Sequence, residues 1–227
     1  MGVQCFSRLC SLIGCEDPYF NVKEKLHQIA LKYLEKTHSR DLTFLIKLAL
    51  AGNSLDPCVI GYNLRELESF VDVDEKALSK LVDILLSPDI KRIAFLLDNN
   101  GEAVLDSLLI RELSSKGKDV KVYVKGSPFE TDVTVGDVSR FGLNELFEGA
   151  EILDTGGAYP AFLSTNVRAK LGEVDLILAK GLANYESFID SPVNVPTALL
   201  LKVKCPVLAN KLSKPQGSYV IVLENFS

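Results

Sequence analysis

The sequence predicts an α/β fold, in which a helical N-terminal part packs on a doubly wound α/β part with a mainly parallel sheet. Two observations predict it. Apolar residues recur at helical spacing before Pro88, and from Lys91 onward short continuous apolar runs alternate with helical stretches. Continuous apolar runs are typical of parallel strands that are buried on both faces. We therefore expect a helical subdomain over residues 1–88 and an α/β domain over residues 89–227.

Three helices are expected before this change of pattern. From about residue 19, apolar side chains recur at three- and four-residue spacing with Lys and Glu between them. Asp41 is a capping residue that opens a second helix, which ends at Gly52. A third helix runs from about Asp74 to Leu86. We interpret the apolar faces of these helices as packing surfaces.

The α/β part is expected to contain six short strands. They are the apolar runs IAFLL (93–97), VKVYV (120–124), EIL (151–153), VDLILA (174–179), PVLA (206–209) and YVIVL (219–223). Helical stretches are expected between several of these strands, over 102–116, 137–147 and 160–171. In open α/β sheets, ligands bind beyond the carboxyl ends of the strands, so the residues that follow each strand are the candidates for a site.

Acidic and amide side chains follow the first two strands, and lysines follow the later ones. Asp98, Asn99 and Asn100 come directly after the first strand. The motif TDVT (131–134) follows the second strand, and Lys180 follows the fourth. Asp and Asn oxygens are ligands that suit magnesium or manganese, and lysines balance the charge of an anion. The sequence therefore predicts a hard cation beside an anion, as in a metal-dependent phosphatase.

Simpler interpretations exist for the same residues. Asp and Asn are preferred helix caps, so a single such residue after the first strand would be a cap by default. Three in a row, with TDVT after the next strand, favour metal binding over capping alone. Lys180 can also be a solvated charge where a strand ends. We interpret the DTGG motif (154–157) as a turn and Lys202 as a surface charge.

Signatures of several other enzyme classes are absent. A haloacid-dehalogenase phosphatase needs Asp-x-Asp after its first strand, and position 100 is Asn. The chain has no GxxxxGK[ST] motif, and no GxGxxG follows the first strand, so P-loop and dinucleotide sites are unsupported. The two histidines, His27 and His38, lie far from the acidic motifs. A Ser-His-Asp hydrolase or a His-rich zinc enzyme is therefore hard to build.

Composition narrows the possible partners and location. Apolar residues make up 47% of the chain, and the net charge of −5 argues against a nucleic-acid partner. No apolar window is long enough for a bilayer span, so no membrane partner is expected. An odd number of cysteines without CxxC spacing predicts free thiols in a cytoplasmic protein. These cysteines are Cys5, Cys10, Cys15, Cys58 and Cys205.

Five motifs together resemble the damage-control phosphatase family, a former domain of unknown function, and above all its small stand-alone prokaryotic branch. The motifs are ALAGNSLD (49–56), DNNGEAVLD (98–106), TDVT (131–134), KGLANYES (180–187) and VKCPVLA (203–209). Each is weak alone, but all five occur in the family's order, and the resemblance covers about residues 15–227. It implies a Rossmann-like, three-layer α/β/α sandwich under a multihelical N-terminal part. It also implies a phosphohydrolase that acts on small phosphometabolites, such as sugar phosphates or damaged cofactor precursors.

The resemblance also implies roles for individual residues. Asp98, Asn99 and Asp132 would bind a divalent metal (Mn, Mg, Co or Ni), with Asp98 and Asp132 catalytic, which makes 89–227 the metal-binding catalytic domain. Lys204 resembles the family's phosphate-contacting lysine, although it precedes the expected strand PVLA and would then lie at that strand's amino end. We nevertheless predict that its ammonium faces the cavity of Asp98 and Asp132. The residues expected to face phosphate or substrate are Lys180, Asn184, Lys204, Asn53, Asp56 and Glu102.

The sequence departs from the family's pattern at three places. The branch usually begins with a longer helical segment that contains Cys-x-x-Cys, so we expect an N-terminally shortened member. The usual Asn-Asp-x-Thr is TDVT here, which keeps the acid Asp132. The usual Lys-Gly-x-Gly-Asn is KGLAN, which puts Ala183 where glycine would let a ligand approach closely. The last change predicts a different substrate preference or weaker activity.

Two other functions stay open beside the phosphatase. One is an S-adenosylmethionine-dependent carboxyl methyltransferase, because a eukaryotic relative has been assigned that activity and the fold resembles methyltransferases. Its adenosyl pocket would have to use the DTGG turn (154–157), the only glycine-rich candidate. The other is a non-catalytic protein that binds a metal or a phosphometabolite. The expected partner is a small phosphorylated metabolite, and the oligomeric state stays open.

Overall fold

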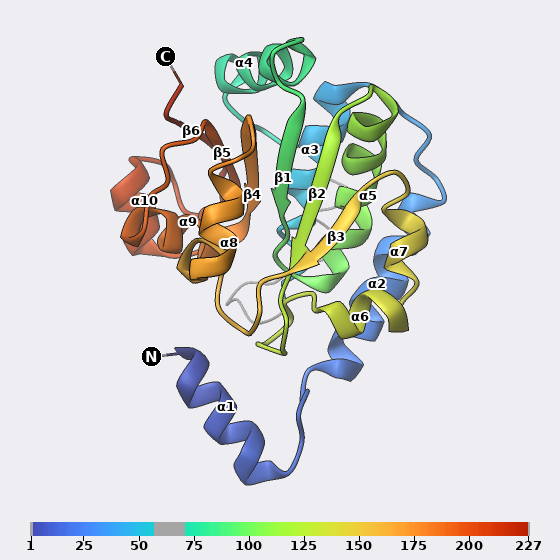
Figure 1. Cartoon of the computed structure of the whole chain (residues 1–227), viewed down its shortest axis with the longest axis vertical. Helices are drawn as coiled ribbons and strands as arrows, with labels where there is room; N and C mark the ends of the chain where they lie inside the picture. Colours follow the sequence, from blue (N-terminus) through green and yellow to red (C-terminus); the bar gives the residue numbers. More distant parts are fainter. Residues whose placement is uncertain (1, 57–70, 227) are drawn as a thin grey trace.

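The computed structural model of the chain describes residues 2–56 and 71–226. Cys58, one of the predicted free thiols, lies outside these residues. Helices come first, and strands alternate with helices from residue 92 onward, as the two periodicities predict (Figure 1). The helices before the first strand are α1 (Gly2–Ile13), α2 (Phe20–Leu34), α3 (Leu42–Gly52) and α4 (Glu75–Leu86). Asp41 caps α3, as expected, and Asp74 caps α4, the helix that was predicted to run from about that residue.

The strands of the described part form one sheet in the order β3-β2-β1-β4-β5-β6. They are β1 (Arg92–Leu96), β2 (Asp119–Val124), β3 (Glu151–Asp154), β4 (Leu176–Lys180), β5 (Thr197–Lys202) and β6 (Tyr219–Glu224). Strands β1 to β5 are parallel, and β6 runs antiparallel to β5 at one edge. The predicted fold class, with its mainly parallel sheet, is confirmed.

Helices cover both faces of the sheet and make three layers (Figure 1). Those after the first strand are α5 (Asn100–Ser115), α6 (Val135–Arg140), α7 (Leu143–Leu146), the 3₁₀ turn η2 (Ala161–Leu163), α8 (Thr165–Leu171), α9 (Gly181–Asp190) and α10 (Pro206–Leu212). Alternate residues of β1 point to opposite faces, as strand geometry requires. Ile93 and Phe95 belong to one hydrophobic cluster with α2 to α7, whereas Ala94 and Leu96 belong to another with η2 and α8 to α10.

The helical part and the sheet share a core. One cluster of buried side chains continues from Leu26 in α2 and Leu45 in α3 to Phe95 in β1 and Leu105 in α5. This packing holds the end of α3 against the start of α5, where the polar residues of the site lie. The division of the chain at residue 88 stays a prediction.

One predicted strand is wrong, and its correction moves a site residue. PVLA begins helix α10, with Pro206 at its first turn and Cys205 Sγ accepting the N–H of Leu208. The strand at this place is β5 (Thr197–Lys202), which is not among the six predicted strands. Lys204 therefore follows the carboxyl end of β5 rather than preceding a strand. The positional argument against Lys204 as a site residue no longer applies.

Two predicted helices are interrupted, and one was missed. The stretch 137–147 contains α6 and α7, separated near Gly142, which has a left-handed φ of 66°. The stretch 160–171 contains η2 and α8. Helix α9 begins at Gly181, directly after β4, and it is not among the predicted helices.

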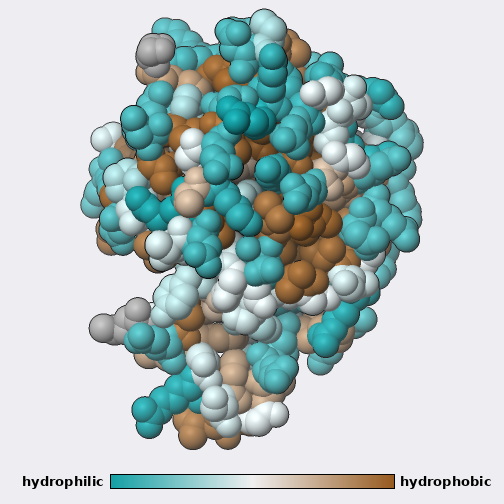
Figure 2. Space-filling view, in the orientation of Figure 1, coloured by the Kyte–Doolittle hydropathy of each residue, from teal (hydrophilic) through white to brown (hydrophobic). Residues whose placement is uncertain are grey.

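Helix α1 was not expected, and it stands away from the body of the molecule (Figure 1). None of its residues is buried, although the ring of Phe6 packs against Phe129 with centroids 5.3 Å apart. A hollow of about 1280 Å³ separates α1 from two loops of the α/β part. Figure 2 shows apolar surface on α1. The exposed apolar residues of α1 are Leu9, Leu12 and Ile13. None of the described helices is long and apolar enough to cross a membrane.

The strand order places one crevice at the centre of the carboxyl edge. Strand β1 lies between β2 and β4, so the chain leaves β1 towards one side of the sheet and leaves β4 towards the other. Connections that diverge in this way leave a crevice between the two strand ends, which is where ligands of open α/β sheets bind.

Candidate active site

A cavity of about 480 Å³ lies beyond the carboxyl ends of β1, β2, β4 and β5. Its polar lining is strongly acidic, and Lys204 is the one lysine on its wall within the described residues. The acidic residues on the wall are Asp56, Asp98, Glu130, Asp132 and Glu186. Phe129 and Leu182 add apolar surface. The cavity therefore combines carboxylates, one ammonium group and a partly apolar wall.

Backbone pairing brings Asp132 beside Asp98. Asn100 donates its N–H to the carbonyl oxygen of Thr131, and Val133 donates its N–H to that of Asp98, both at 2.9 Å. These bonds make a short antiparallel bridge between the loops after β1 and β2. Both residues are buried, and both line the same cavity. The predicted proximity of the two acids thus arises from local backbone structure.

The two acids are buried and lie close to further carboxylates. Burial raises the pKa of the Asp98 carboxyl to about 7, and Glu102 adds to that shift. Burial likewise raises the pKa of Asp132 to about 7, against the opposing effect of Lys125, whose Nζ lies 3.5 Å from Asp132 Oδ2. Among the described residues, Asp132 Oδ2 is buried and accepts no hydrogen bond besides its ion pair with Lys125. A buried carboxylate oxygen of this kind in an acidic cavity can bind a cation.

The predicted donor set fits a hard divalent cation. Asp98, Asn99 and Asp132 all line the cavity and offer carboxylate and amide oxygens, the ligands that Mg²⁺ and Mn²⁺ prefer. Within the described residues, no group of three or more His, Cys, Asp and Glu is arranged to hold a metal. An ion at this place would therefore take its other ligands from water or phosphate, as Mg²⁺ commonly does.

Asn99 is also the N-cap of α5, so the capping interpretation holds for this residue. Its Oδ1 accepts the N–H of Glu102 at 3.3 Å, and its Nδ2 donates to Glu102 Oε2 at 3.1 Å. An amide oxygen has two lone pairs, so capping leaves one for a cation.

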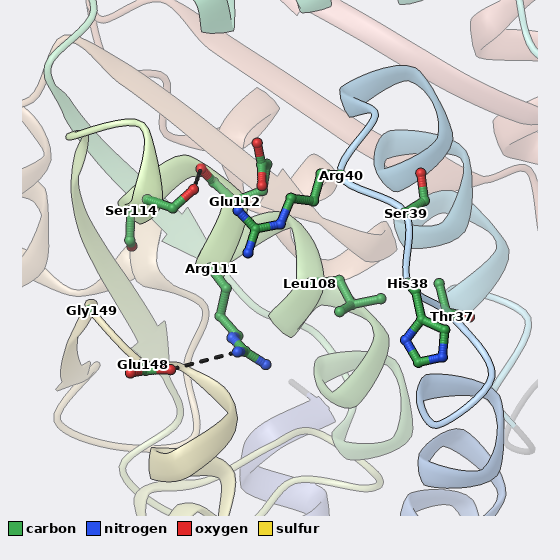
Figure 3. A pocket seen from close by; sticks show the side chains of 11 residues that line it. Thr37, His38, Ser39, Arg40, Leu108, Arg111, Glu112, Ser114, Glu148 and Gly149 are labelled. Carbon is green, nitrogen blue, oxygen red and sulfur yellow. Dashed lines mark hydrogen bonds and ion pairs between the residues drawn. The ribbon is translucent and has the colours of Figure 1, made fainter.

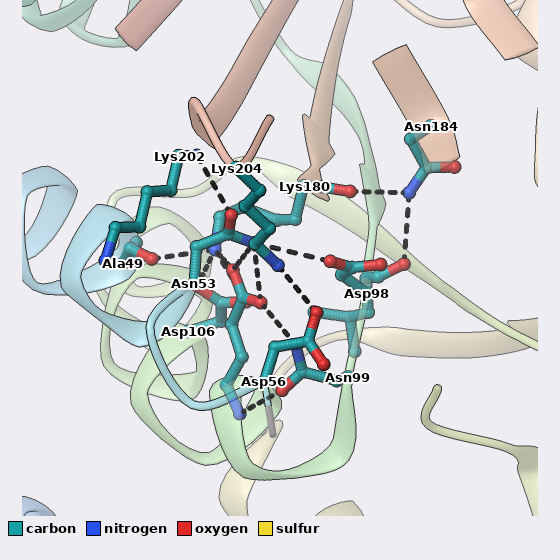
Figure 4. A network of polar contacts seen from close by, with 12 residues as sticks. Ala49, Asn53, Asp56, Asp98, Asn99, Asp106, Lys180, Asn184, Lys202 and Lys204 are labelled. Carbon is teal, nitrogen blue, oxygen red and sulfur yellow. Dashed lines mark hydrogen bonds and ion pairs between the residues drawn. The ribbon is translucent and has the colours of Figure 1, made fainter. Parts of the chain in front are cut away.

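Asn53 connects the helical part to the site (Figure 4). It is fully buried at the end of α3, and its Nδ2 donates to Asp98 Oδ2 at 3.3 Å and to Glu102 Oε2 at 3.0 Å. Its Oδ1 accepts the N–H of Lys202 at 2.9 Å. The amide of Asn53 thus joins the carboxyl ends of β1 and β5. This position is compatible with its predicted place on the helical side of the site.

Lys180 does not lie on the cavity wall. Its Nζ is completely buried and donates to Ala49 O at 2.7 Å, to Asp106 Oδ1 at 3.0 Å and to Glu102 Oε1. Burial alone would lower the pKa of Lys180, but Asp106 and Glu102 outweigh it and raise the pKa. The solvated-charge interpretation of Lys180 is therefore wrong. Its ammonium holds the inner network together, and Glu102 lies in that network rather than on the wall.

The start of α9, directly after Lys180, is shaped around Asp98. Gly181 has a left-handed φ of 79°, and a Cβ at this position would lie 1.8 Å from Asp98 Oδ2. Only glycine fits such a contact. Asn184, in the next turn of α9, donates to Leu97 O at 3.1 Å and to Lys180 O at 2.8 Å. Asn184 therefore joins the ends of β1 and β4, and it does not appear on the cavity wall.

Lys204 and Asp56 form an ion pair beside the two acids. Lys204 Nζ lies 2.7 Å from Asp56 Oδ2, and both residues line the cavity. Burial alone would lower the pKa of Lys204, but Asp98 and Asp56 outweigh it and raise the pKa. The ammonium is therefore charged and faces the cavity that holds Asp98 and Asp132.

Three further residues were missed by the sequence analysis. Lys125 follows β2 and contacts Asp132, a position that parallels Lys180 after β4 and could have been found by the same rule. Glu130 lies on the cavity wall with a positive φ of 47°, which is uncommon outside glycine. Glu186 lies on the wall from α9, a helix that was not predicted.

Comparison with known proteins decides the family. Residues 1–220 match the model of the damage-control phosphatase ARMT1-like domain. The chain belongs to this family. Two curated damage-control phosphatases are similar along most of their length. The one from Archaeoglobus fulgidus is 30% identical over 228 residues, covering 94% of this chain and 78% of that protein. The one from Pyrococcus horikoshii is 31% identical over 242 residues, covering 99% and 81%.

A solved structure supports the fold of this damage-control phosphatase family member. The crystal structure of a DUF89 family protein from Pyrococcus horikoshii superposes with a TM-score of 0.80. The match covers 97% of this chain and 80% of that chain, at 24% sequence identity. The arrangement of sheet and helices is therefore shared with that protein.

Two other hollows differ in character from the acidic cavity. One, of about 510 Å³, lies beside the end of α5, where Arg111 pairs with Glu148 at 3.6 Å (Figure 3). Its charged lining is mixed, with Arg40 and Glu112 as well, so it favours neither anion nor cation. The other, of about 450 Å³, includes the DTGG turn (154–157) after the edge strand β3, away from the central crevice.

Proposed function

We propose that the chain is a divalent-metal-dependent phosphohydrolase that acts on small phosphorylated metabolites, such as sugar phosphates or damaged phosphorylated metabolites. Membership of the damage-control phosphatase family supports a phosphatase. The observation that carries the metal-dependent mechanism is the pair of buried acids, Asp98 and Asp132, with Lys204 on the same cavity wall. We propose Mn²⁺, Mg²⁺, Co²⁺ or Ni²⁺ as the ion.

Each residue then has a defined task. Asp98, Asn99 and Asp132 hold the cation, which when bound offsets the negative charge that develops on the phosphate oxygens. Lys204 contacts another phosphate oxygen, and Asp56 orients its ammonium through the ion pair of 2.7 Å. The substrate dianion thus meets two sources of positive charge, which its carboxylate surroundings require.

Carboxylates that line the cavity would also transfer protons during hydrolysis. Asp132 has two carboxylate oxygens, so one can bind the cation while the other accepts a proton from the attacking water. The water oxygen bonds to phosphorus as the bond from phosphorus to the ester oxygen breaks, and the alcohol leaves with the proton that Asp132 accepted. Asn53 and the inner network of Lys180 and Glu102 keep Asp98 in position.

The outer part of the cavity would receive the alcohol part of the substrate. Phe129 and Leu182 offer apolar surface there, and Glu130 and Glu186 accept hydrogen bonds from hydroxyl groups. A cavity of about 480 Å³ suits a small metabolite. We also propose a cytoplasmic location, which the free thiols of the four described cysteines support.

The test is a panel of phosphate esters assayed with each metal. Hydrolysis of p-nitrophenyl phosphate and of at least one phosphometabolite, abolished by EDTA and restored by Mn²⁺, is the expected result. A parallel arm supplies S-adenosylmethionine without phosphate esters and measures methyl transfer. Methyl transfer without hydrolysis would replace the phosphatase by the methyltransferase. Metal-induced stabilisation without turnover of any ester would indicate a binding protein.

A further inference from the structure

One fully buried lysine lies outside the cavity and has no part in the proposed mechanism. Lys23, in the first turn of α2, has no exposed surface. Its Nζ donates to Asp17 Oδ2 and to Asp137 Oδ2, each at 2.9 Å. Asp17 precedes α2, whereas Asp137 is 114 residues further along the chain, in α6. An ion pair buried this deeply is costly to form and needs both partners in place.

Asp137 extends this contact to the loop that carries Asp132. The same Oδ2 of Asp137 accepts the backbone N–H of Thr134 at 2.9 Å and its hydroxyl at 2.8 Å. Thr134 in turn caps α6, since its Oγ1 accepts the N–H of Asp137. This capping box fixes the chain two residues after Asp132. Lys23 therefore restrains Asp132 through a single carboxylate.

The backbone of Lys23 restrains the other acidic loop. Its carbonyl oxygen accepts a hydrogen bond from Asn100 Nδ2 at 3.3 Å, directly after Asn99. One turn further along α2, Leu26 is so close to Gly101 that a Cβ there would lie 2.8 Å from Leu26 Cβ. One face of α2 thus contacts both segments that carry the proposed metal ligands.

We propose that Lys23 is a positioning residue for the metal centre, because it locks the loops after β1 and β2 in the arrangement that brings Asp98 beside Asp132. The inference rests on the proposed function. Partners of metal ligands in other proteins change metal affinity or activity by about 10–100-fold when mutated. An ordinary structural ion pair would change stability without changing the metal site.

The test compares two lysine variants in the full chain. Lys23→Met keeps the length of the side chain and removes its charge. Lys118→Met is the matched control, since Lys118 Nζ donates to Ser87 O and Ile90 O, at 2.8 and 2.7 Å, away from both acidic loops. The readouts are the dissociation constant for Mn²⁺ by calorimetry, the melting temperature without metal, and kcat and KM for p-nitrophenyl phosphate.

For Lys23→Met we expect about tenfold weaker Mn²⁺ binding and a lower kcat with a nearly unchanged KM. Lys118→Met should lower the melting temperature while Mn²⁺ affinity stays at the wild-type value. Lys23→Arg, which keeps the charge, should recover most of the affinity. Wild-type Mn²⁺ affinity in folded Lys23→Met, or an equal loss in Lys118→Met, would overturn the proposal.

A second variant decides the case if Lys23→Met does not fold. Asp137→Asn keeps an acceptor for Thr134 but weakens the attraction to Lys23, and about threefold weaker Mn²⁺ binding is expected. Unchanged affinity in this variant would overturn the proposal. Failure of the proposed function itself would be visible in the wild type, as an absence of Mn²⁺ binding and of hydrolysis.

Discussion

Lys180 is the last residue of β4 and Lys204 follows the neighbouring parallel strand β5, yet the two lysines lie in different environments. Lys180 points inward and is saturated by Ala49, Glu102 and Asp106. Lys204 points to the cavity and pairs with Asp56 at its wall. Position after a strand is therefore not enough to make a lysine a ligand of substrate. The role of each lysine depends on the residues that contact its ammonium group.

The difference originates in α3 and α5. Glu102 and Asp106 are four residues apart on α5, so they share one face of the helix and converge on Lys180. The end of α3 adds the carbonyl oxygen of Ala49. The inner network thus serves the fold, and the cavity wall is left for chemistry. Each prediction below tests this division.

The largest effect is expected at the two acids of the wall. Asp98→Asn and Asp132→Asn should each lower kcat/KM for a phosphate ester by at least about 10³-fold, since they remove negative ligands from the cation and a proton acceptor. Both should also abolish stabilisation by Mn²⁺, measured as a shift in melting temperature. Asp175→Asn is the control, because Asp175 pairs with Arg92 at the amino ends of β1 and β4, opposite to the cavity. If Asp175→Asn lost activity while Asp98→Asn and Asp132→Asn kept it, the assignment of the two acids to the active site would be wrong.

The lysine pair should separate stability from activity. Lys180→Met leaves Glu102 and Asp106 buried without their partner, so the free energy of unfolding should fall by about 3–5 kcal/mol. Lys204→Ala should lower kcat/KM by about 10²-fold, as expected for loss of one group that stabilises developing charge, with a smaller loss of stability than Lys180→Met because its partner Asp56 borders the cavity. Denaturant titration and steady-state kinetics check both. The reverse pattern would exchange the roles of the two lysines.

The acidic cavity also predicts a pH dependence of stability without metal. The folded-state pKa values of Asp98 and Asp132, about 7, lie above the ordinary Asp value of 3.8. The folded state therefore binds more protons than the unfolded state between these pH values. This contribution to stability is fully present below about pH 3.8 and is lost as the pH rises through about 7. The melting temperature of the metal-free protein should fall from pH 5.5 to pH 8.

A variant shows whether the acids cause this dependence. Asp98→Asn removes one of the two titrating carboxyl groups. The melting temperature of the metal-free variant should therefore fall less between pH 5.5 and pH 8 than that of the wild type. Saturating Mn²⁺ should also oppose the fall, because the cation compensates the carboxylates at high pH. An equally steep fall in the variant would show that other groups titrate.

The smallest effect is expected at Ala183, which lines the cavity from α9. Ala183→Gly should lower the free energy of unfolding by about 1 kcal/mol, because glycine is unfavourable in a helix. Removing the methyl group should raise kcat/KM for bulkier phosphate esters relative to smaller ones by about two- to tenfold. Ala169→Gly, at an exposed position of α8, is the control that should lose stability without a change of preference. Equal changes for all esters would show that Ala183 does not limit the pocket.

The fold was predictable because periodicity reports burial. The helices capped by Asp41 and Asp74 and the alternation of strands and helices were confirmed. The exchange of β5 and α10 was not predictable from short apolar runs, since periodicity cannot separate a four-residue strand from the first turn of a helix. Pro206 was the available signal, because proline suits the first turn of a helix.

The site was predictable only where it depends on strand ends. Asp98 and Asp132 meet because the loops after adjacent strands pair through their backbones. The environments of Lys180 and Asn53 depend on the end of α3, whose approach to the sheet no local pattern reports. The catalytic and ligand roles of all these residues stay predictions.

A crystal structure with Mn²⁺ and inorganic phosphate tests the central claim most directly. We predict an anomalous peak for one Mn²⁺ bound by oxygens of Asp98, Asn99 and Asp132, with phosphate between the ion and Lys204 Nζ. Lys180 should keep its contacts with Glu102 and Asp106. Mn²⁺ bound elsewhere, or phosphate bound by Lys180 instead of Lys204, would contradict the account.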